Sequence, residues 1–290
     1  MIRVLFLAAR PKTLPAAVAP VVVGSALAWR LAGEFSWLLA WCTLLSTLSI
    51  QVATNYFNDA VDARKGADTA GRQGPLRAVA AGLISPGQMM AAGGAMLVLA
   101  VLISLPMVVA RGWPVVAIGL VSMFFTYGYT GGPVPLAYRG LGEFFVLLFF
   151  GLVAVVGTVF VQTGEWRMEA MLLGGQVGML STVLIAINNL RDRVEDAGSN
   201  KRTLAVRFGE RFGKVEIAVL CLAPYLLSIG WHGYGLERMI SIPSGLVLLG
   251  ILIALKVWRT APGRIYNKFL ALSALHLVLW TGLTVWALMP

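Results

Sequence analysis

Long apolar runs limit what this chain can fold into more than any other feature of its sequence. They recur from end to end of the 290 residues, and each has about 17 to 25 residues, enough to cross a bilayer core roughly 30 Å thick. Hydrophobic residues make up 58% of the chain and charged residues only 12%, against roughly 25% charged residues in an ordinary soluble domain. The sequence therefore predicts an all-α integral membrane protein, with a single domain over residues 1–290.

About nine transmembrane helices in one bundle are expected from these runs. The predicted spans are 14–32, 35–55, 88–110, 113–130, 143–162, 170–189, 214–231, 239–257 and 268–289. The amino terminus has only a short apolar stretch before Arg10. It does not resemble a cleaved signal peptide, so we expect the first helix to stay in the protein.

Basic residues divide unequally between the two sides of the predicted bundle. If the amino terminus is cytoplasmic, 19 of the 23 Lys and Arg residues face the cytoplasm, and only Arg30, Arg111, Arg167 and Arg238 lie outside. The positive-inside rule favours this orientation, which we expect in the inner membrane of a bacterial cell. The same rule accounts for the net charge of +10, so membrane lipid is an expected partner and nucleic acid is not.

Acidic residues gather in two cytoplasmic connections, 56–87 and 190–213. Seven of the 13 acids lie there, although the positive-inside rule calls for none. Four residues of each connection and its preceding helix also match at an offset of 133, namely Asn55, Asp59, Val61 and Asp62 against Asn188, Asp192, Val194 and Glu195. This faint repeat predicts two parallel four-helix halves followed by a ninth helix.

Oxygen-bearing side chains recur at helical spacing in both segments. The candidate metal ligands are Asn55, Asp59 and Asp62 in the first segment and Asn188, Asp192 and Asp196 in the second. If each helix continues through its motif, these residues fall within about 80° of one another around its axis, and both faces can point into one cavity. Oxygen ligands suit Mg²⁺, so the four aspartates are candidates for catalysis through a bound metal. The two histidines, His232 and His276, lie outside both motifs, which disfavours zinc.

Basic residues follow each acidic motif and could bind a diphosphate. The candidates are Lys65, Arg72 and Arg77 after the first motif and Lys201 and Arg202 after the second. Acids alone would repel phosphate, whereas metal ions together with Lys and Arg form a clamp for it. The simpler alternative is a pair of solvated loops in which the basic residues serve topology or lipid headgroups. Acids at membrane depth are costly and usually functional, which argues against that alternative.

These motifs resemble the UbiA-type aromatic prenyltransferase superfamily. The residues concerned read NDAVDARKGAD at 58–68 and NNLRDRVEDAGSNKRTLAVRFG at 188–209. The flanking segments RPKTLP at 10–15, GPLRAVAAGLIS at 74–85 and AYRGLGE at 137–143 resemble the menaquinone-pathway branch, the 1,4-dihydroxy-2-naphthoate polyprenyltransferases. One departure is that Gly66 stands four residues after Asp62, where the simplest pattern has an acid. Asp68 follows two residues later, and its role stays open.

The resemblance implies a fold of nine helices and a metal-dependent transfer. Mg²⁺, with two ions expected, would bind a polyprenyl diphosphate. The prenyl group would pass to 1,4-dihydroxy-2-naphthoate with loss of CO₂ and diphosphate, giving demethylmenaquinone for menaquinone biosynthesis. Candidates for holding the acceptor carboxylate are Arg10, Lys12 and Arg139. Tyr127 and Tyr129 are candidates for shielding an allylic cation by cation–π attraction, although an interfacial aromatic belt explains them more simply.

Two other functions remain open on the sequence alone. Another aromatic acceptor such as 4-hydroxybenzoate would suit the same motifs, because it is also a phenolic carboxylate. A transporter of anionic solutes would also suit parallel repeats and intramembrane charge. The concentration of acids and bases on one side of the bundle disfavours the transporter, since alternating access ordinarily needs polar groups near the midplane.

Overall fold

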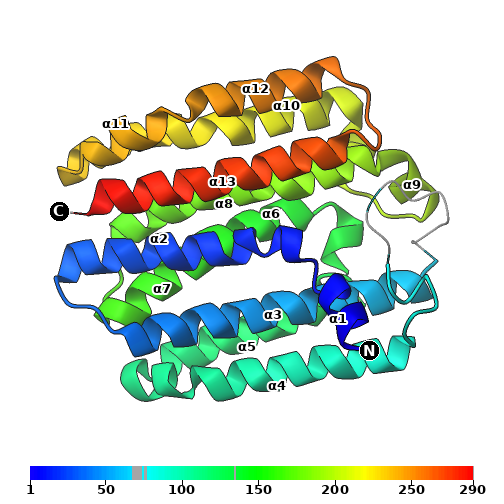
Figure 1. Ribbon diagram of the computed structural model, residues 1–290, viewed down its shortest axis with the longest axis horizontal. Coiled ribbons are helices and arrows are strands. Elements are labelled where there is room, and N and C mark those ends of the chain that lie inside the picture. The colour runs from blue at the N-terminus through cyan, green and yellow to red at the C-terminus, as the bar shows by residue number, and fades with distance from the viewer. Residues whose placement is uncertain (67–73, 75–76, 134, 290) are drawn as a thin grey trace.

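The computed structural model is a bundle of long helices that run side by side (Figure 1), and it describes residues 1–66, 74, 77–133 and 135–289. The helices are α1 (Ile2–Ala8), η1 (Pro11–Thr13), α2 (Pro15–Ala32), α3 (Trp37–Arg64), α4 (Pro86–Arg111), α5 (Trp113–Gly128), η2 (Leu136–Arg139), α6 (Gly142–Val146), η3 (Leu147–Val153), α7 (Ala154–Thr163), α8 (Met168–Arg191), α9 (Arg193–Gly198), α10 (Leu204–Leu227), η4 (Ser228–Tyr234), α11 (Arg238–Ser244), α12 (Val247–Arg259) and α13 (Tyr266–Leu288). The predicted all-helical membrane fold is confirmed.

The predicted number of nine spans is an approximation. Within the described chain, seven helices are long and apolar enough to cross a membrane, and an eighth is present if α11 and α12, bent by 45°, form one span. The predicted span 113–130 corresponds to α5, which is apolar but has only 16 residues. The span 143–162 is assembled from α6, a π-helical stretch (η3) and α7. This interrupted span is one of the seven, so the short helix α5 and the bent pair α11 and α12 account for the difference between the prediction and the structure.

Polar residues at the helix starts satisfy backbone groups that have no partner inside the helix. Ser85 and Gln88 form a capping box on α4, with the Ser85 hydroxyl accepting from the Gln88 amide at 3.2 Å and the Gln88 side chain accepting from the Ser85 amide at 3.1 Å. Thr203 accepts from the amide of Val206 at the start of α10. Because unsatisfied amides are costly near lipid, these caps favour helix starts at the predicted connections.

Glycines bring α8 close to η3. A Cβ on Gly151 would lie 2.4 Å from the carbonyl oxygen of Gly174, and one on Gly178 would lie 2.7 Å from that of Leu147. The sequence predicts close packing at Gly174 and Gly178 from their small-xxx-small spacing, and the structure confirms it.

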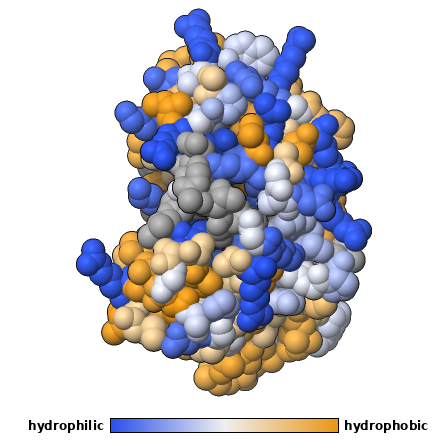
Figure 2. Space-filling view, turned by 90° about the vertical axis from the view of Figure 1, so that its right-hand side faces the viewer, coloured by the Kyte–Doolittle hydropathy of each residue, from blue (hydrophilic) through white to orange (hydrophobic). Residues whose placement is uncertain are grey.

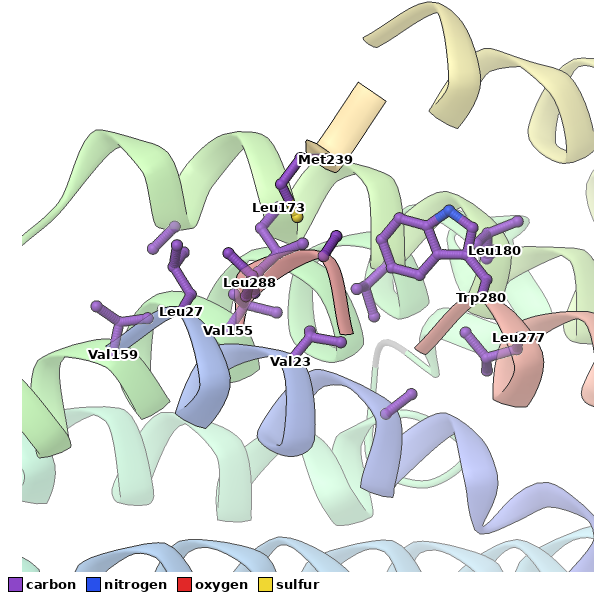
Figure 3. Close-up of a cluster of buried hydrophobic side chains, with 14 of the residues drawn as sticks. Val23, Leu27, Val155, Val159, Leu173, Leu180, Met239, Leu277, Trp280 and Leu288 are labelled. Atoms are coloured by element: carbon purple, nitrogen blue, oxygen red, sulfur yellow. The ribbon is translucent and has the colours of Figure 1, made fainter. Parts of the chain in front are cut away.

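The main hydrophobic core joins helices from distant parts of the sequence. Figure 3 shows Leu27 of α2, Leu173 of α8 and Trp280 of α13 converging in one cluster, and all three side chains are fully buried. The two cysteines, Cys42 and Cys221, are also buried within the bundle, as expected of core residues. This core holds α2, α8 and α13 together and so positions the ends at which the site lies.

Candidate functional site

Both acidic motifs lie at the same end of the bundle. α3 and α8 run in the same direction and finish near α1 and α9, on the right of Figure 1. Figure 2 looks onto this end and shows hydrophilic side chains spread over much of it, with hydrophobic side chains toward the lower edge. The predicted location of the two motifs on one side of the bundle is therefore borne out by the fold.

A single large cavity connects the two motifs with the apolar interior. Its volume is about 1360 Å³. Asn55, Asp59 and Asp62 line it from α3, and Asn188 and Asp192 line it from the end of α8. Much of the remaining lining is apolar or aromatic and comes from α4, α5, α7 and α13. The cavity can therefore hold a molecule with an anionic head at one end and a long hydrocarbon tail.

The carboxylates of the first motif are held by the segment that follows the connection. Asp59 accepts from the backbone amides of Ala78 and Val79 at 3.0 and 3.1 Å. Asp62 accepts from Arg77 Nη2 at 3.0 Å and from the Tyr138 hydroxyl at 2.9 Å. Both aspartates are buried, and α3 continues through them to Arg64. The helical face expected for Asn55, Asp59 and Asp62 is present.

The second motif differs from the expected continuous helix. α8 ends at Arg191, Asp192 has non-helical backbone angles (φ −92°, ψ 7°), and α9 begins at Arg193. The two oxygens of Asp192 accept from Arg191 Nε and Nη2, each at 2.7 Å. Asp196 accepts from Lys201 Nζ at 3.3 Å and is buried, but it is not part of the cavity lining. The break therefore separates Asp196 from the face shared by Asn188 and Asp192.

The basic candidates fall at different depths around the site. Arg77 and Lys201 line the cavity. Lys65 donates to the Thr130 carbonyl at 2.7 Å and lies 4.2 Å from the centre of the Tyr138 ring. Burial lowers the pKa of Lys65, and the charge of Asp62 partly opposes this shift. Arg202 is exposed, and Arg72, like Asp68, lies outside the described residues.

Only some of the residues predicted to bind the acceptor or shield a cation line the cavity. Arg10 and Lys12 line the cavity, whereas Arg139 is exposed and its carbonyl accepts from Arg207 Nη2 at 2.8 Å. Tyr129 lines the cavity. Tyr127 lies outside the lining, with its ring packed edge-on against Phe57 at 5.9 Å.

The oxygen ligands at the polar end fit a hard divalent cation. Among the described residues, no group of three or more His, Cys, Asp or Glu side chains is close enough together to form a metal site. Mg²⁺ commonly takes only one or two carboxylates and completes its shell with waters and substrate phosphate oxygens. Asp59, Asp62 and Asp192 provide buried carboxylates around a cavity large enough for such a substrate. They therefore suit Mg²⁺ that binds together with a diphosphate.

Several residues of the site were not identified from the sequence. Phe125, Phe145 and Phe149 form an aromatic cluster in the cavity wall, with centroid distances of 4.8 to 5.6 Å. Their shared wall arises where α5 meets α6 and η3, and only the repeated phenylalanines at 144–145 and 149–150 hint at it. Such rings can shield a carbocation through their negative faces.

Two further residues that the sequence did not identify form hydrogen bonds with polar groups of the second motif. Asn267 of α13 accepts from Arg191 Nη1 at 2.7 Å. Glu143, at the start of α6, is buried and accepts from Asn189 Nδ2 at 2.7 Å. Glu143 stands in the AYRGLGE segment, which resembles the menaquinone-pathway branch but by itself indicates no role for this side chain. Contacts between helices this far apart in sequence leave no local signal.

Comparison with known proteins gives consistent matches. The model of the UbiA prenyltransferase family matches residues 17–278. A 1,4-dihydroxy-2-naphthoate octaprenyltransferase of Haemophilus influenzae is 36% identical over 242 residues, covering 78% of this chain and 78% of the relative. The protein of the same description from Escherichia coli is 38% identical over 207 residues, covering 69% and 67%.

Solved structures share the fold at low sequence identity. A UbiA homologue of Aeropyrum pernix has a TM-score of 0.75 at 14% identity, with 97% of this chain and 99% of that chain covered. A UbiA homologue of Archaeoglobus fulgidus, solved with DMAPP and Mg²⁺ bound, has a TM-score of 0.62 at 16% identity, with 95% and 97% covered. These likenesses establish the arrangement of the helices.

Proposed function

The chain belongs to the UbiA prenyltransferase family, and from this premise we propose that it transfers a polyprenyl group from an allylic diphosphate to 1,4-dihydroxy-2-naphthoate. CO₂ and diphosphate are released, and the product is demethylmenaquinol, the reduced quinol form of demethylmenaquinone. The observation that carries the chemistry is the single cavity in which acidic and basic side chains surround one end and apolar side chains line the rest. The choice of acceptor is supported by relatives named for it that are 33–38% identical to this chain.

The polar end of the cavity binds the diphosphate of the donor. Asp59, Asp62 and Asp192 would hold Mg²⁺, with two ions expected, and Asn55 and Asn188 would add oxygen ligands, while Asp196 supports the second motif through Lys201. When bound, Mg²⁺ neutralises the charge that develops on the departing diphosphate. Arg77 and Lys201 line the cavity and contact phosphate oxygens, and Lys65, Arg72 and Arg202 add positive charge around them.

Bond cleavage at the donor creates the electrophile. The allylic C–O bond breaks and its electron pair leaves with the diphosphate, while Arg77 and Lys201 stabilise the negative charge. The resulting cation lies against the rings of Phe125, Phe145 and Phe149, with Tyr129 at the same end of the wall. The enclosing apolar lining excludes water, which would otherwise capture the cation.

The acceptor ring supplies the electrons for the new C–C bond. Its two hydroxyls enrich the ring, and the carbon that bears the carboxylate attacks the allylic cation. The C–CO₂ bond then breaks, CO₂ departs, and the electron pair returns to the ring. Arg10 and Lys12 line the cavity and pair with the carboxylate before it is lost. Arg139 is the weaker candidate because its side chain is exposed.

A competition assay with purified protein in detergent tests this function. The protein receives prenyl diphosphate, Mg²⁺ and equal amounts of dihydroxynaphthoate and 4-hydroxybenzoate, with the naphthoate carboxyl carbon labelled. The naphthoquinol should dominate the products, and labelled CO₂ should appear in step with it. Dominant prenylation of hydroxybenzoate would contradict the acceptor, and prenylated naphthoate that keeps its label would contradict decarboxylation. Passage of intact anionic solutes into liposomes without transfer would favour a transporter.

We place the protein in the bacterial inner membrane with the amino terminus and the acidic end in the cytoplasm. Ala197, exposed in α9, and Gly233, exposed at the opposite end in η4, offer positions for single cysteines. An impermeant thiol reagent added to intact spheroplasts should label Gly233→Cys, whereas Ala197→Cys should react only after the membrane is opened. Labelling of Ala197→Cys in intact spheroplasts would reverse the orientation.

A further inference from the structure

Two glycines line the apolar part of the cavity where no side chain fills the space beside them. Gly119 lies in α5 and Gly157 in α7. A Cβ on Gly119 would have no atom within 4 Å outside its own helical turn, and one on Gly157 would meet only Ile118 Cδ1, at 3.9 Å. Because Ile118 precedes Gly119, this contact places both glycines at the same level of the cavity.

Close helix packing does not explain these two glycines. At Gly151 and Gly178, an added Cβ would lie within 3.0 Å of the backbone of the neighbouring helix, so the lack of a side chain is required there. Gly119 and Gly157 have no such neighbour. Since glycine is unfavourable inside a helix relative to alanine, their small size needs another reason. The open cavity beside them provides one.

The glycines lie well inside the cavity, away from its charged end. Gly119 precedes Tyr129 by ten residues, which corresponds to roughly 15 Å along a helix. Thr43 is the deepest lining residue of α3 and precedes Asp59 by 16 residues, or roughly 24 Å. Met107 and Val161 belong to a buried cluster at that depth, and Met107 Sδ contacts the Thr43 hydroxyl at 3.1 Å. These residues close the far end.

Side chains next to Gly119 in α5 both line the cavity and are exposed. Val116 and Leu120 of α5 line the cavity and are 41% and 63% exposed. Gly119 stands between them in the helix. A side chain at Gly119 would therefore narrow the cavity at this level.

We propose that Gly119 and Gly157 determine how long a prenyl donor the enzyme accepts. The inference rests on the proposed function, because it takes the cavity as the site of the prenyl tail. An isoprene unit adds four chain bonds of about 1.5 Å, or roughly 5 Å when extended. About three units reach the level of the glycines, and longer donors must pass between them. The absence of two side chains leaves that passage open.

Substitution of Gly119 by leucine tests the proposal. Gly94 of α4 gives a matched control, because a Cβ there also meets no atom within 4 Å but the residue does not line the cavity. Purified wild type, Gly119→Leu and Gly94→Leu are assayed for kcat/KM with geranyl, farnesyl, geranylgeranyl and octaprenyl diphosphate and one acceptor. Gly119→Leu should keep geranyl and farnesyl transfer within about twofold and lower octaprenyl transfer at least about tenfold, the scale on which one added group alters fit in an apolar pocket. Gly94→Leu should match the wild type.

Gly157→Leu provides a second, independent variant, and Gly119→Ala should give a smaller loss of the long donor than Gly119→Leu. Equal loss of all four donors in both leucine variants, or unchanged octaprenyl transfer in both folded proteins, would overturn the proposal while leaving prenyl transfer intact. Absence of transfer from every donor in the wild type would instead overturn the proposed function, and the role of the glycines with it.

Discussion

The two acidic motifs match in sequence but are held in different ways. In the first, α3 continues through both aspartates, and backbone amides of Ala78 and Val79 clamp Asp59 from the far side of the connection. In the second, α8 stops at Asp192, whose carboxylate accepts a hydrogen bond from the adjacent Arg191. The first motif therefore depends on a segment that folds back onto its helix, whereas the second is organised largely by its own neighbours.

Similar candidate ligands can thus be held in place by hydrogen bonds from different parts of a bundle. Tyr138, between α5 and α6, donates to Asp62 in the first motif. Asn267 of α13 accepts from Arg191 in the second motif. The last helix, which lies outside the two predicted four-helix halves, thus contributes to only one of the two motifs through these contacts. The two halves are similar in sequence around their motifs, but the tertiary contacts of the motifs differ.

Loss of one cavity-lining carboxylate from either motif should have the largest effect. Asp62→Asn and Asp192→Asn keep the size of the side chain but remove the charge proposed to hold Mg²⁺, and each should lower kcat by about 10² to 10³. Initial rates across a Mg²⁺ titration, with size-exclusion profiles to verify folding, measure this. Glu195→Gln is the matched control in the second segment and should stay within about twofold of the wild type. Normal turnover by both aspartate variants would rule out a two-motif metal site.

Removal of either paired arginine should destabilise the fold. Arg77–Asp62 and Arg191–Asp192 are both buried pairs, and loss of one partner leaves a buried charge at a cost of about 3 kcal/mol. Arg77→Gln and Arg191→Gln should therefore both lower the unfolding midpoint, and Arg191→Gln also removes the contact with Asn267. Thermal unfolding midpoints in detergent measure both. An unchanged midpoint in either variant would mean that its buried pair does not stabilise the fold.

The hydrogen bonds that orient each motif should have smaller and separable effects. Tyr138→Phe removes a donor to Asp62, and Asn267→Ala removes an acceptor from Arg191; each should lower activity about tenfold, as expected of a bond to a charged group. These bonds share no partner, so the free-energy effects should add in the double variant within about 0.5 kcal/mol. Strong non-additivity in kcat/KM would show that the two motifs act as one coupled unit.

The smallest expected effect concerns the pH dependence conferred by Lys65. Burial lowers its pKa below the ordinary 10.5, so its charge is lost at lower pH than that of an exposed lysine. Between the lowered pKa and 10.5 the unfolded chain binds more protons, and the contribution of Lys65 to stability rises with pH in that window. The alkaline limb of kcat/KM should therefore move to higher pH in Lys65→Arg, whose guanidinium stays charged. If the alkaline limb of kcat/KM did not move, Lys65 would not contribute to diphosphate binding.

Much of the fold and the type of site were predictable because their signals are local. Apolar runs of membrane length gave the bundle and the approximate number of spans. The spacing of Asn55, Asp59 and Asp62 predicted their common face, and Arg77 and Lys201 follow their motifs closely enough to be recognised as partners. Hydropathy and helical periodicity are both patterns among residues within one span or a few turns, so they can be recognised in a single sequence.

The remainder of the site was decided only by tertiary structure. The break of α8 at Asp192 separates Asp196 from the cavity, although a continuous helix fits the spacing equally well. Glycine spacing on α8 predicted a close helix neighbour, but only packing decided that η3 would fill that position. The bond between Tyr138 and Asp62 joins residues 76 positions apart, and no local pattern encodes such a contact. The sequence by itself thus determined which groups reach one end of the membrane, while packing determined which of them touch, because contacts depend on how distant helices meet.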